Sequence, residues 1–315
     1  MILITGGMGF IGLHTARRIL DAGEDVVLTM YKTRREPSFI KDELGKRAKV
    51  EQVDVTDADA LVEVGQKHNV DGIVHLAVPA LAQLSPSEDY HVNMDGLINI
   101  MEAARRLEVR RMTLASSIAV YSGVPNGPFL EDTPLPVQSG NPTEAFKKSF
   151  EILGLHYADR AGMDVVCMRI SGIWGPVYHS MANLPSRLAH AAVKGVEADL
   201  ASARGGVPFE DDGSDLCYVK DCAQGIQLLQ MADTLPHRIY NVASGVATTY
   251  GELRDAVQAV VPESKITLQP GAGPRAKKDP YLDIGRISEV VGYKPQYDVR
   301  SGMADYIAWL RQNPQ

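Results

Sequence analysis

Three glycines near the N-terminus, Gly6, Gly9 and Gly12, have the spacing of a turn that binds phosphate. They follow the apolar run 1–4 and precede the amphipathic run 13–22. A tight turn, close approach of the backbone to a pyrophosphate, and close packing of helix on strand each require glycine. The helix that follows points unpaired N–H groups and its positive dipole end at the phosphate. The sequence therefore predicts a dinucleotide-binding site, and a turn without a ligand is the less favoured alternative.

The elements that position this turn alternate between short apolar strands and amphipathic helices. Strands are predicted at 26–30, 50–53, 72–76, 111–116, 164–169 and 239–243, and helices at 57–68, 89–107, 143–160, 184–195, 249–260 and 301–309. Uninterrupted apolar strands are expected where helices cover both faces of a sheet. The pattern predicts an α/β fold with a doubly wound parallel sheet of the Rossmann type.

The length of 315 residues favours two units, or one large unit with an appended lobe. A dinucleotide-binding domain is predicted at 1–171, with a returning strand near 238–243. The segment from Gly172 to Arg238 is expected to be irregular, with one helix, and to begin the substrate lobe. A smaller C-terminal substrate-binding lobe is therefore predicted at 172–237 and 244–315.

The composition excludes several classes of protein. Hydrophobic residues make up 45% of the chain and charged residues 23%, as in ordinary globular proteins. The net charge of -7 argues against binding to the phosphate backbone of a nucleic acid. The three cysteines lack C-x-x-C spacing, so neither a disulfide framework nor a metal site is predicted. Without a membrane-length apolar stretch or a cationic leader, we expect a cytoplasmic protein that acts on a small molecule.

Seven short motifs follow one another around the predicted sheet. They are Thr5-Gly-Gly-Met-Gly-Phe-Ile-Gly12, Asp54-Val55, His75-Leu-Ala77, Asn93-Met-Asp-Gly96, Ser116-Ser-Ile-Ala-Val-Tyr121, the run from Arg169 to Pro176, and Tyr218-Val-Lys-Asp221. In this order and spacing the chain resembles the extended short-chain dehydrogenase/reductase family, the NAD-dependent epimerases and dehydratases. The resemblance covers nearly the whole chain.

The resemblance implies a cofactor site and its residues. These are Gly6, Gly9, Phe10, Ile11 and Gly12 at the pyrophosphate, Asp54 and Val55 at the adenine, Leu76 and Ala77 at the end of the fourth strand, the structural Asn93, and Lys147 at the nicotinamide ribose. It also implies that Ser117 binds the substrate oxygen. A lone histidine at a strand end usually satisfies backbone groups, so His75 is interpreted as structural.

One position departs from the family pattern. The family places a tyrosine four residues before the active lysine; here Lys147 and the following Glu151 are present, but Thr143 stands in the tyrosine's place. An aliphatic hydroxyl titrates far above a phenol, so Thr143 is a poor acid or base for hydride transfer. The predicted catalytic residues are Ser117, Lys147 and Thr143.

Three interpretations of this departure stay open. Water or a neighbouring group, such as Tyr121, Tyr178 or His179, could complete redox chemistry with Ser117 and Lys147. The protein could instead bind its cofactor without turnover, as a sensor or scaffold. The local alignment could also be shifted, with a tyrosine from elsewhere filling the role.

The residues after Ser117 restrict the reaction type. In the resembled family, dehydratases and decarboxylases of nucleotide sugars carry carboxylates there, whereas this chain has Ile118 and Ala119. Epimerase or ketoreductase chemistry at a hydroxyl or ketone carbon fits better, with hydride passing to and from a nicotinamide.

The predicted substrate end also departs from the family. Members that bind nucleotide sugars usually carry an arginine just before the Asp215 position, where it clamps pyrophosphate, and this chain has Ser214. Arg275, Lys277 and Lys278 form either a second basic contact or a solvated charge run. A sugar acid or free polyol therefore competes with a nucleotide sugar as substrate.

The choice between NAD and NADP depends on the end of the second strand. NAD-binding members carry an acid there for the ribose 2′-hydroxyl, but this chain has Met30. The cations Lys32, Arg34 and Arg35 follow, which suits a 2′-phosphate and predicts a preference for NADP over NAD. A solvated basic loop beside Glu36 is the alternative. The resemblance further implies a homodimer formed through the helices that begin near 89 and 143.

Overall fold

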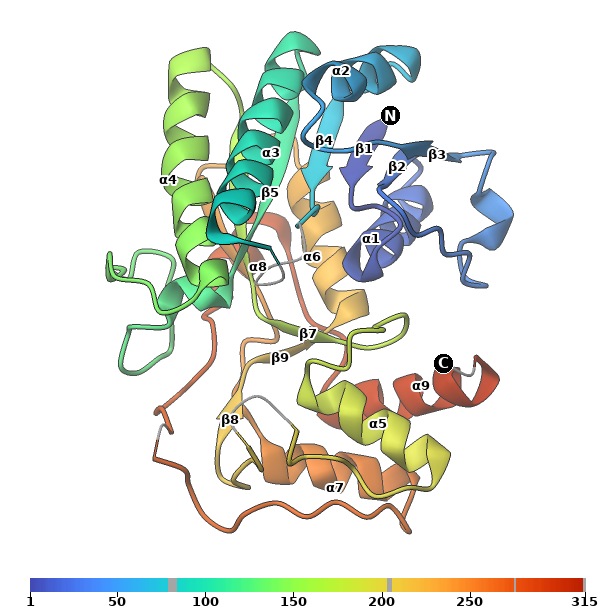
Figure 1. Ribbon diagram of the computed structural model, residues 1–315, viewed down its shortest axis with the longest axis vertical. Coiled ribbons are helices and arrows are strands. Elements are labelled where there is room, and N and C mark those ends of the chain that lie inside the picture. The colour runs from blue at the N-terminus through green and yellow to red at the C-terminus, as the bar shows by residue number, and fades with distance from the viewer. Residues whose placement is uncertain (79–83, 203–205, 275, 314–315) are drawn as a thin grey trace.

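A seven-stranded sheet lies at the centre of the upper part of the molecule, as the computed structural model in Figure 1 shows. The structure describes residues 1–78, 84–202, 206–274 and 276–313. The strands are β1 (Ile2–Thr5), β2 (Val26–Met30), β3 (Ala48–Gln52), β4 (Gly72–His75), β5 (Arg111–Ser117), β6 (Val165–Ile170) and β10 (Ile239–Val242). Their order is β10-β6-β5-β4-β1-β2-β3, and every neighbouring pair is parallel. The predicted doubly wound α/β fold is confirmed.

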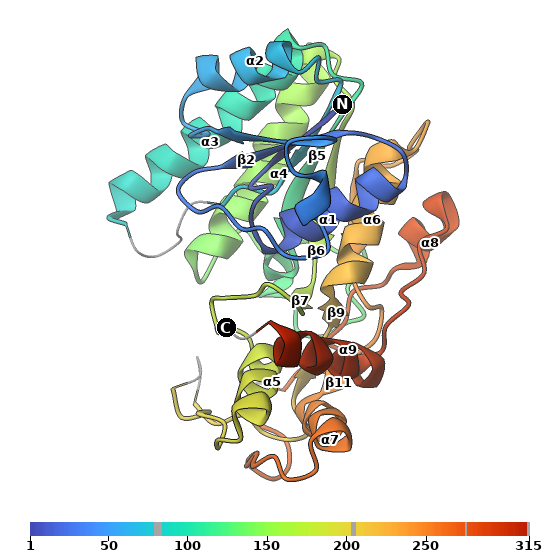
Figure 2. The same cartoon turned by 90° about the vertical axis from the view of Figure 1, so that its right-hand side faces the viewer.

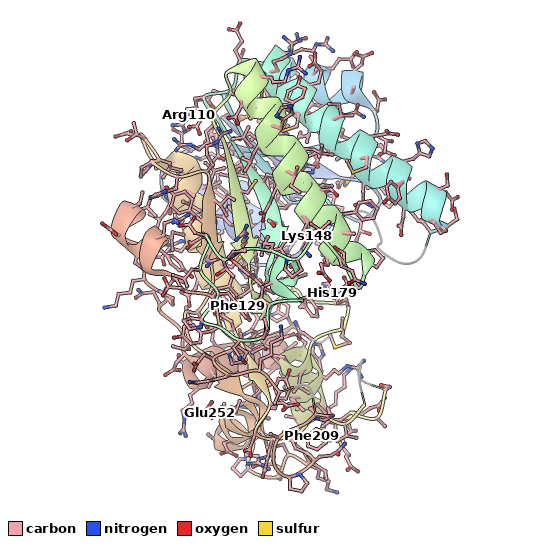
Figure 3. The ribbon with its side chains drawn as sticks, turned by 90° about the vertical axis from the view of Figure 1, so that its left-hand side faces the viewer. Arg110, Phe129, Lys148, His179, Phe209 and Glu252 are labelled. Atoms are coloured by element: carbon pink, nitrogen blue, oxygen red, sulfur yellow. The ribbon has the colours of Figure 1, made fainter. Side chains whose placement is uncertain are left out.

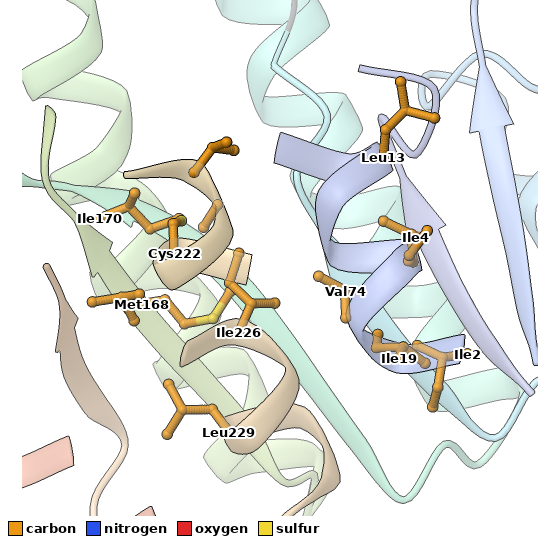
Figure 4. Close-up of a cluster of buried hydrophobic side chains, with 14 of the residues drawn as sticks. Ile2, Ile4, Leu13, Ile19, Val74, Met168, Ile170, Cys222, Ile226 and Leu229 are labelled. Atoms are coloured by element: carbon orange, nitrogen blue, oxygen red, sulfur yellow. The ribbon is translucent and has the colours of Figure 1, made fainter. Parts of the chain in front are cut away.

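Helices cover both faces of the sheet because the strands are apolar on both sides. Alternate residues of a strand point to opposite faces, so Ile2 and Ile4 pack on one side while Leu3 packs on the other. The first face is covered by α1 (Phe10–Asp21), α6 (Val219–Met231) and α8 (Gly285–Val291), as Figure 4 shows in part for α1 and α6. The second face is covered by α2 (Ala58–Lys67), α3 (Pro86–Arg106) and α4 (Pro142–Ala161).

A second lobe lies below the sheet in Figure 1 and has its own apolar core. Its elements are α5 (Leu184–Lys194), α7 (Tyr250–Val260) and α9 (Val299–Gln312), with the short strands β7 (Gly172–Trp174), β8 (Gly213–Ser214), β9 (Leu216–Tyr218) and β11 (Thr248–Thr249). Trp174, Tyr218 and Tyr306 are buried in this core. Figure 2 shows α5, α7 and α9 grouped at the end of the molecule away from α2.

Helix α6 is the main difference from the sequence prediction, which gave the segment from Gly172 to Arg238 one helix only. Cys222, Ile226 and Leu229 of α6 pack against the sheet, although the helix lies within the range assigned to the substrate lobe. No side chain caps its first turn after Tyr218, so the sequence carries no start signal there. The division into 1–171 and a separate lobe stays a prediction.

The long segment between β5 and α4 is held by contacts at both ends. After the 3-10 turn η2 (Ile118–Tyr121), the N–H of Phe129 donates to the carbonyl of Tyr281 at 2.8 Å. Lys148 of α4 pairs with Glu144 at 2.7 Å and donates to the carbonyl of Gln138 at 3.1 Å. Figure 3 places Lys148 above the segment that carries Phe129.

Two further features of the described chain concern its cysteines and the length of its apolar helices. Cys167, Cys217 and Cys222 are buried as free thiols. In the described part of the chain, no helix combines the length and the apolar character needed to cross a membrane.

Candidate active site

The first turn of α1 is open to an anion. Gly9 occupies the N-cap and offers no side chain, and the first turn contains no acidic residue. Within the described residues, the N–H groups of Phe10, Ile11 and Gly12 have no hydrogen-bond partner. Unpaired N–H groups and a positive dipole end favour phosphate. The turn therefore fits the pyrophosphate of a dinucleotide, as its sequence predicts.

The turn itself leaves no room for side chains. Gly6 has φ +65°, in the left-handed region. A Cβ at Gly12 would lie 2.4 Å from the carbonyl oxygen of Gly6, and one at Gly9 would lie 2.9 Å from the same atom. Helix α1 can therefore pack this closely on the turn that follows β1 only with glycine at both positions.

A cleft of about 400 Å³ connects this turn with helix α4. The predicted site residues that line it are Gly6, Gly9, Phe10, Ile11, Gly12, Leu76, Ser117, Thr143 and Lys147; the others are Val78, Ala115, Ser116, Ile170, Ser171, Ile173 and Tyr178. It lies at the carboxyl ends of β1, β4 and β5, where the strand order reverses. Open α/β sheets bind ligands at such a switch point.

Lys147 lies on the wall of the cleft formed by α4. Its Nζ donates to the carbonyl of Ala115 at 2.7 Å, which fixes the ammonium at the end of β5. Burial lowers the pKa of Lys147 to about 8. The group is therefore a desolvated cation at neutral pH, and a cation out of water interacts strongly with negative charge on a ligand.

Ser117 and Thr143 contribute hydroxyl groups to the same cleft. The Oγ of Ser117 accepts from the N–H of Ala119 at 3.1 Å, and its own proton has no acceptor among the described residues. Thr143, in the first turn of α4, is half-buried. Both hydroxyls can therefore contact a substrate oxygen, with Lys147 nearby.

Tyr121 is not placed to replace the missing phenol. Its hydroxyl accepts from Arg169 Nη1 at 2.7 Å and lies 3.1 Å from Oδ1 of Asn241. Burial raises the pKa of Tyr121 to about 12. Arg169 in turn binds both oxygens of Glu151, so this tyrosine belongs to a buried structural network outside the cleft.

The two neighbours Tyr178 and His179 differ in placement. Tyr178 lines the cleft and is half-buried, whereas His179 is exposed and does not line it. Figure 3 shows His179 on the chain below α4. Of the three replacement groups that the sequence suggested, only Tyr178 reaches the cleft.

His75 is buried next to the glycine turn. The N–H of Ala77 donates to Oγ1 of Thr5 at 3.3 Å, and this oxygen lies 2.7 Å from Nδ1 of His75. The Thr5 hydroxyl and His75 Nδ1 share one hydrogen bond that joins β1 to β4. Burial, with a smaller effect of the Lys147 cation, lowers the pKa of His75 to about 3. A neutral histidine that holds the β1 and β4 ends together fits the structural interpretation.

Six predicted cofactor residues are not among those that line this cleft: Arg34, Arg35, Asp54, Val55, Ala77 and Asn93. The carboxylate of Asp54 accepts from the N–H and hydroxyl of Thr56, at 2.9 and 2.8 Å. Val55 packs beside Gly96 of α3, and buried Asn93 donates to the carbonyl of Asp89 at 2.8 Å. Asp54 and Val55 follow β3 at the carboxyl edge of the sheet, the edge at which the glycine turn also lies. Their contacts with adenine stay predictions.

Two of the basic residues after β2, Arg34 and Arg35, already contact other groups of the protein. Arg34 pairs with Glu36 at 2.8 Å, which neutralises it. Arg35 donates from Nη1 to the carbonyl of Met8 at 3.1 Å, so its guanidinium lies against the glycine turn. Arg35 is thus the better placed of the two to meet a phosphate.

A second cleft of about 460 Å³ lies below the first, toward the lobe. Ser214, Arg187, Phe209, Asp212 and Tyr250 are among its lining residues. Arg187 is not predicted as a site residue from the sequence, because a single arginine inside a helix belongs to no recognisable motif. Its Nε already donates to the carbonyl of Met181 at 2.8 Å.

Lys277 does not provide the second basic contact for a substrate at this cleft. Its Nζ donates instead to the carbonyls of Ser122 and Val124, at 3.0 and 2.7 Å. Neither Lys277 nor Lys278 is among the residues that line the lower cleft, and Arg275 lies outside the described residues. Across the ranges that the structure describes, no group of three or more His, Cys, Asp or Glu residues could hold a metal.

The sequence pattern of the NAD dependent epimerase/dehydratase family matches residues 2–243. The chain belongs to this family. It is 27% identical to the probable UDP-glucuronate 4-epimerase of Rhizobium meliloti, over 99% of this chain and 97% of that protein. It is 26% identical to the UDP-glucose 4-epimerase of Lacticaseibacillus casei, over 94% and 92%. The predicted family and enzyme type, extended short-chain dehydrogenase/reductase, are confirmed.

Solved structures confirm the fold over the full length. The UDP-glucose 4-epimerase of Thermus thermophilus in complex with NAD superposes with a TM-score of 0.79 at 24% identity, covering 99% of both chains. The enzyme of Bifidobacterium longum in complex with NAD+ and UDP gives 0.83 at 22% identity, covering 99% of this chain and 98% of that one.

Proposed function

We propose that this protein binds NAD or NADP at the glycine turn and transfers hydride at a hydroxyl or ketone carbon of a sugar, as an epimerase or reductase. The observation that carries this proposal is the single cleft that joins the open first turn of α1 to Ser117 and Lys147. The family membership and the 4-epimerases among its relatives support it.

Each residue has a distinct part in the proposed reaction. A bound nicotinamide supplies the carbon that accepts or returns hydride. The N–H groups of Phe10, Ile11 and Gly12 would hold its pyrophosphate, and the Lys147 ammonium would hold the ribose. Ser117 donates a hydrogen bond to the substrate oxygen, where negative charge develops, and the nearby Lys147 cation stabilises that charge. Thr143 orients the same oxygen without exchanging its proton.

Arg35 is the residue that distinguishes the two cofactors in this proposal. The family description and the two solved neighbours favour NAD, whereas a guanidinium beside the glycine turn suits the 2′-phosphate of NADP. Titration calorimetry of the wild type and Arg35→Ala with both cofactors separates them. A selective loss of NADP affinity in the variant supports the predicted NADP preference, and equal losses or tighter NAD binding by the wild type overturn it.

The proposed substrate is a sugar or sugar acid that extends from the upper to the lower cleft. Among the described residues that line the lower cleft, Arg187 and Asp212 carry formal charges, and these cancel. Ser214 supplies no cation for a nucleoside diphosphate at the position where the family usually carries an arginine. The relatives named as UDP-sugar 4-epimerases make nucleotide sugars the direct competitor.

One assay tests the function and its alternative together. Purified protein is incubated with NAD or NADP, or with their reduced forms, and with nucleotide sugars, sugar acids and keto-sugars, while nicotinamide absorbance and product configuration are followed. Turnover of any of these supports the enzyme. Calorimetric binding of the cofactor with no turnover across the panel would favour a sensor or scaffold. This is the second candidate function because Thr143 stands where the family has its active-site tyrosine.

A further inference from the structure

We propose that Tyr178 transfers the substrate proton in this cleft and that His14 is the positioning residue that holds it there. The proposal rests on the proposed hydride-transfer function and deepens it. It assigns the phenol that Thr143 does not provide to a different element, the turn after β7.

Tyr178 has the placement that proton transfer requires. Its side chain lines the same cleft as Lys147, Ser117 and Thr143. Its ring packs edge-on against Phe10, the first residue of α1, with centroids 5.0 Å apart and planes at 71°. In the described structure its hydroxyl has no hydrogen-bond partner, so a substrate oxygen can occupy that position.

The backbone before Tyr178 is held in an uncommon conformation. Val177 is buried and has φ +73°, a value that β-branched residues rarely adopt because their side chains clash with the backbone. Gly175, two residues earlier, has φ +134°, and a Cβ there would lie 2.8 Å from the side chain of Val219. Such strain persists only where surrounding contacts fix the chain, and it is common at functional sites.

His14 supplies one of those fixing contacts from α1. Its Nε2 donates to the carbonyl of Pro176 at 3.0 Å, across 162 residues of sequence. Its ring also stacks on Phe39, with centroids 4.6 Å apart. Burial lowers the pKa of His14 to about 4, so it remains a neutral donor at neutral pH. The helix whose first turn faces the phosphates therefore also fixes the turn that presents Tyr178.

Other buried phenols are engaged elsewhere. Tyr218 donates to Asp305, and the Tyr306 hydroxyl lies 3.2 Å from Nε2 of His190. Tyr121 belongs to the Arg169 network described above. None of these three lines the cleft.

The chemical step balances with the groups named. In the oxidising direction, the deprotonated Oη of Tyr178 would take the substrate hydroxyl proton as the carbon–oxygen bond becomes double, and a bound oxidised nicotinamide would accept the hydride that leaves the same carbon. In the reducing direction, the phenol returns the proton as the carbonyl accepts hydride.

The variant Tyr178→Phe tests the catalytic role. We expect kcat to fall by about 100-fold or more, because general acid–base groups contribute on that scale. We expect the calorimetric affinity for NAD or NADP and the thermal unfolding midpoint to stay at wild-type values. Tyr31→Phe, at an exposed tyrosine outside the cleft, is the matched control and should leave kcat unchanged.

The outcomes separate this inference from the proposed function. If the wild type turns over substrate and Tyr178→Phe does so equally fast, the role of Tyr178 is wrong and the proposed function stands. A wild type that binds cofactor but turns over no substrate overturns the function, and the role of Tyr178 falls with it.

Two variants of His14 test the positioning role. His14→Gln keeps an N–H donor for Pro176, whereas His14→Phe keeps a ring beside Phe39 and loses the donor. We expect His14→Phe to lower kcat by about tenfold with KM and cofactor affinity within about twofold of wild type, consistent with loss of one hydrogen bond. His14→Gln should restore kcat. Equal kcat in both variants, or a loss of cofactor affinity that matches the loss of kcat, would contradict the positioning role.

Discussion

Burial lowers the pKa of two side chains beside the glycine turn, and each shift has a measurable consequence. Lys147 and His75 are both desolvated, and desolvation disfavours the charged form of either group. At neutral pH Lys147 keeps its charge, whereas His75 is neutral. The pair thus places one cation, rather than two, near the substrate oxygen.

Lys147 predicts an alkaline limit to activity. Because its pKa is about 8, kcat/KM should fall as pH rises through that value and the ammonium is lost. Lys147→Arg keeps its charge at higher pH, so any residual activity should lack this alkaline limb. Steady-state kinetics across alkaline pH check both statements, and an unchanged limb in the arginine variant would assign it to another group.

His75 predicts a loss of stability in acid. Its folded pKa of about 3 lies below the unfolded value of 6.5, so between these values the unfolded chain binds the extra proton. The stability present above pH 6.5 should therefore decrease as pH falls toward the folded value, by about 2 kcal/mol over the first two units. Urea unfolding across this range measures the slope. His75→Asn, which retains an acceptor for Thr5 without titrating, should have a shallower slope.

At the scale of elements, the glycine turn and helix α1 act as one unit. A side chain at Gly12 would meet backbone atoms of Gly6 and Gly7 at 2.4 to 2.8 Å, which cannot move aside as a flexible side chain would. Gly12→Ala should therefore push α1 away from β1, lower the free energy of unfolding by about 2 kcal/mol, and abolish dinucleotide binding. Denaturant unfolding and calorimetry test this.

Gly140→Ala is the matched control for this change. Its Cβ would meet only the Glu144 carboxylate, at an ordinary 3.8 Å, and its backbone is outside the left-handed region. It should keep both stability and cofactor affinity. Equal losses in the two alanine variants would contradict the argument from backbone contact.

At the scale of the whole molecule, α3 and α4 carry an apolar outer surface. Ile98 and Leu153 are each 48% exposed and line a surface cleft of about 730 Å³ between the two helices. Exposed apolar surface of this kind is characteristic of an interface. The homodimer implied by the sequence resemblance uses these same helices and stays a prediction.

Light scattering tests that prediction. The wild type should have twice the chain mass of 34.3 kDa, and Leu153→Lys should return it to the single-chain mass. Val137, which is 97% exposed in the loop before α4, gives the control Val137→Lys, which should stay dimeric. A wild type that scatters as a single chain would contradict the predicted homodimer.

The sequence by itself determined the sheet, the glycine turn and the family, because these depend on local patterns: short apolar runs, amphipathic helices and glycines where no side chain fits. Ser117, Thr143 and Lys147, which it singled out, line one cleft, and their catalytic roles stay predictions. It missed α6, which begins without a capping side chain. Only the tertiary structure separated Tyr178 from Tyr121, because that choice depends on contacts between distant segments. A hydrogen bond from His14 to Pro176, 162 residues away, leaves no local pattern in the chain.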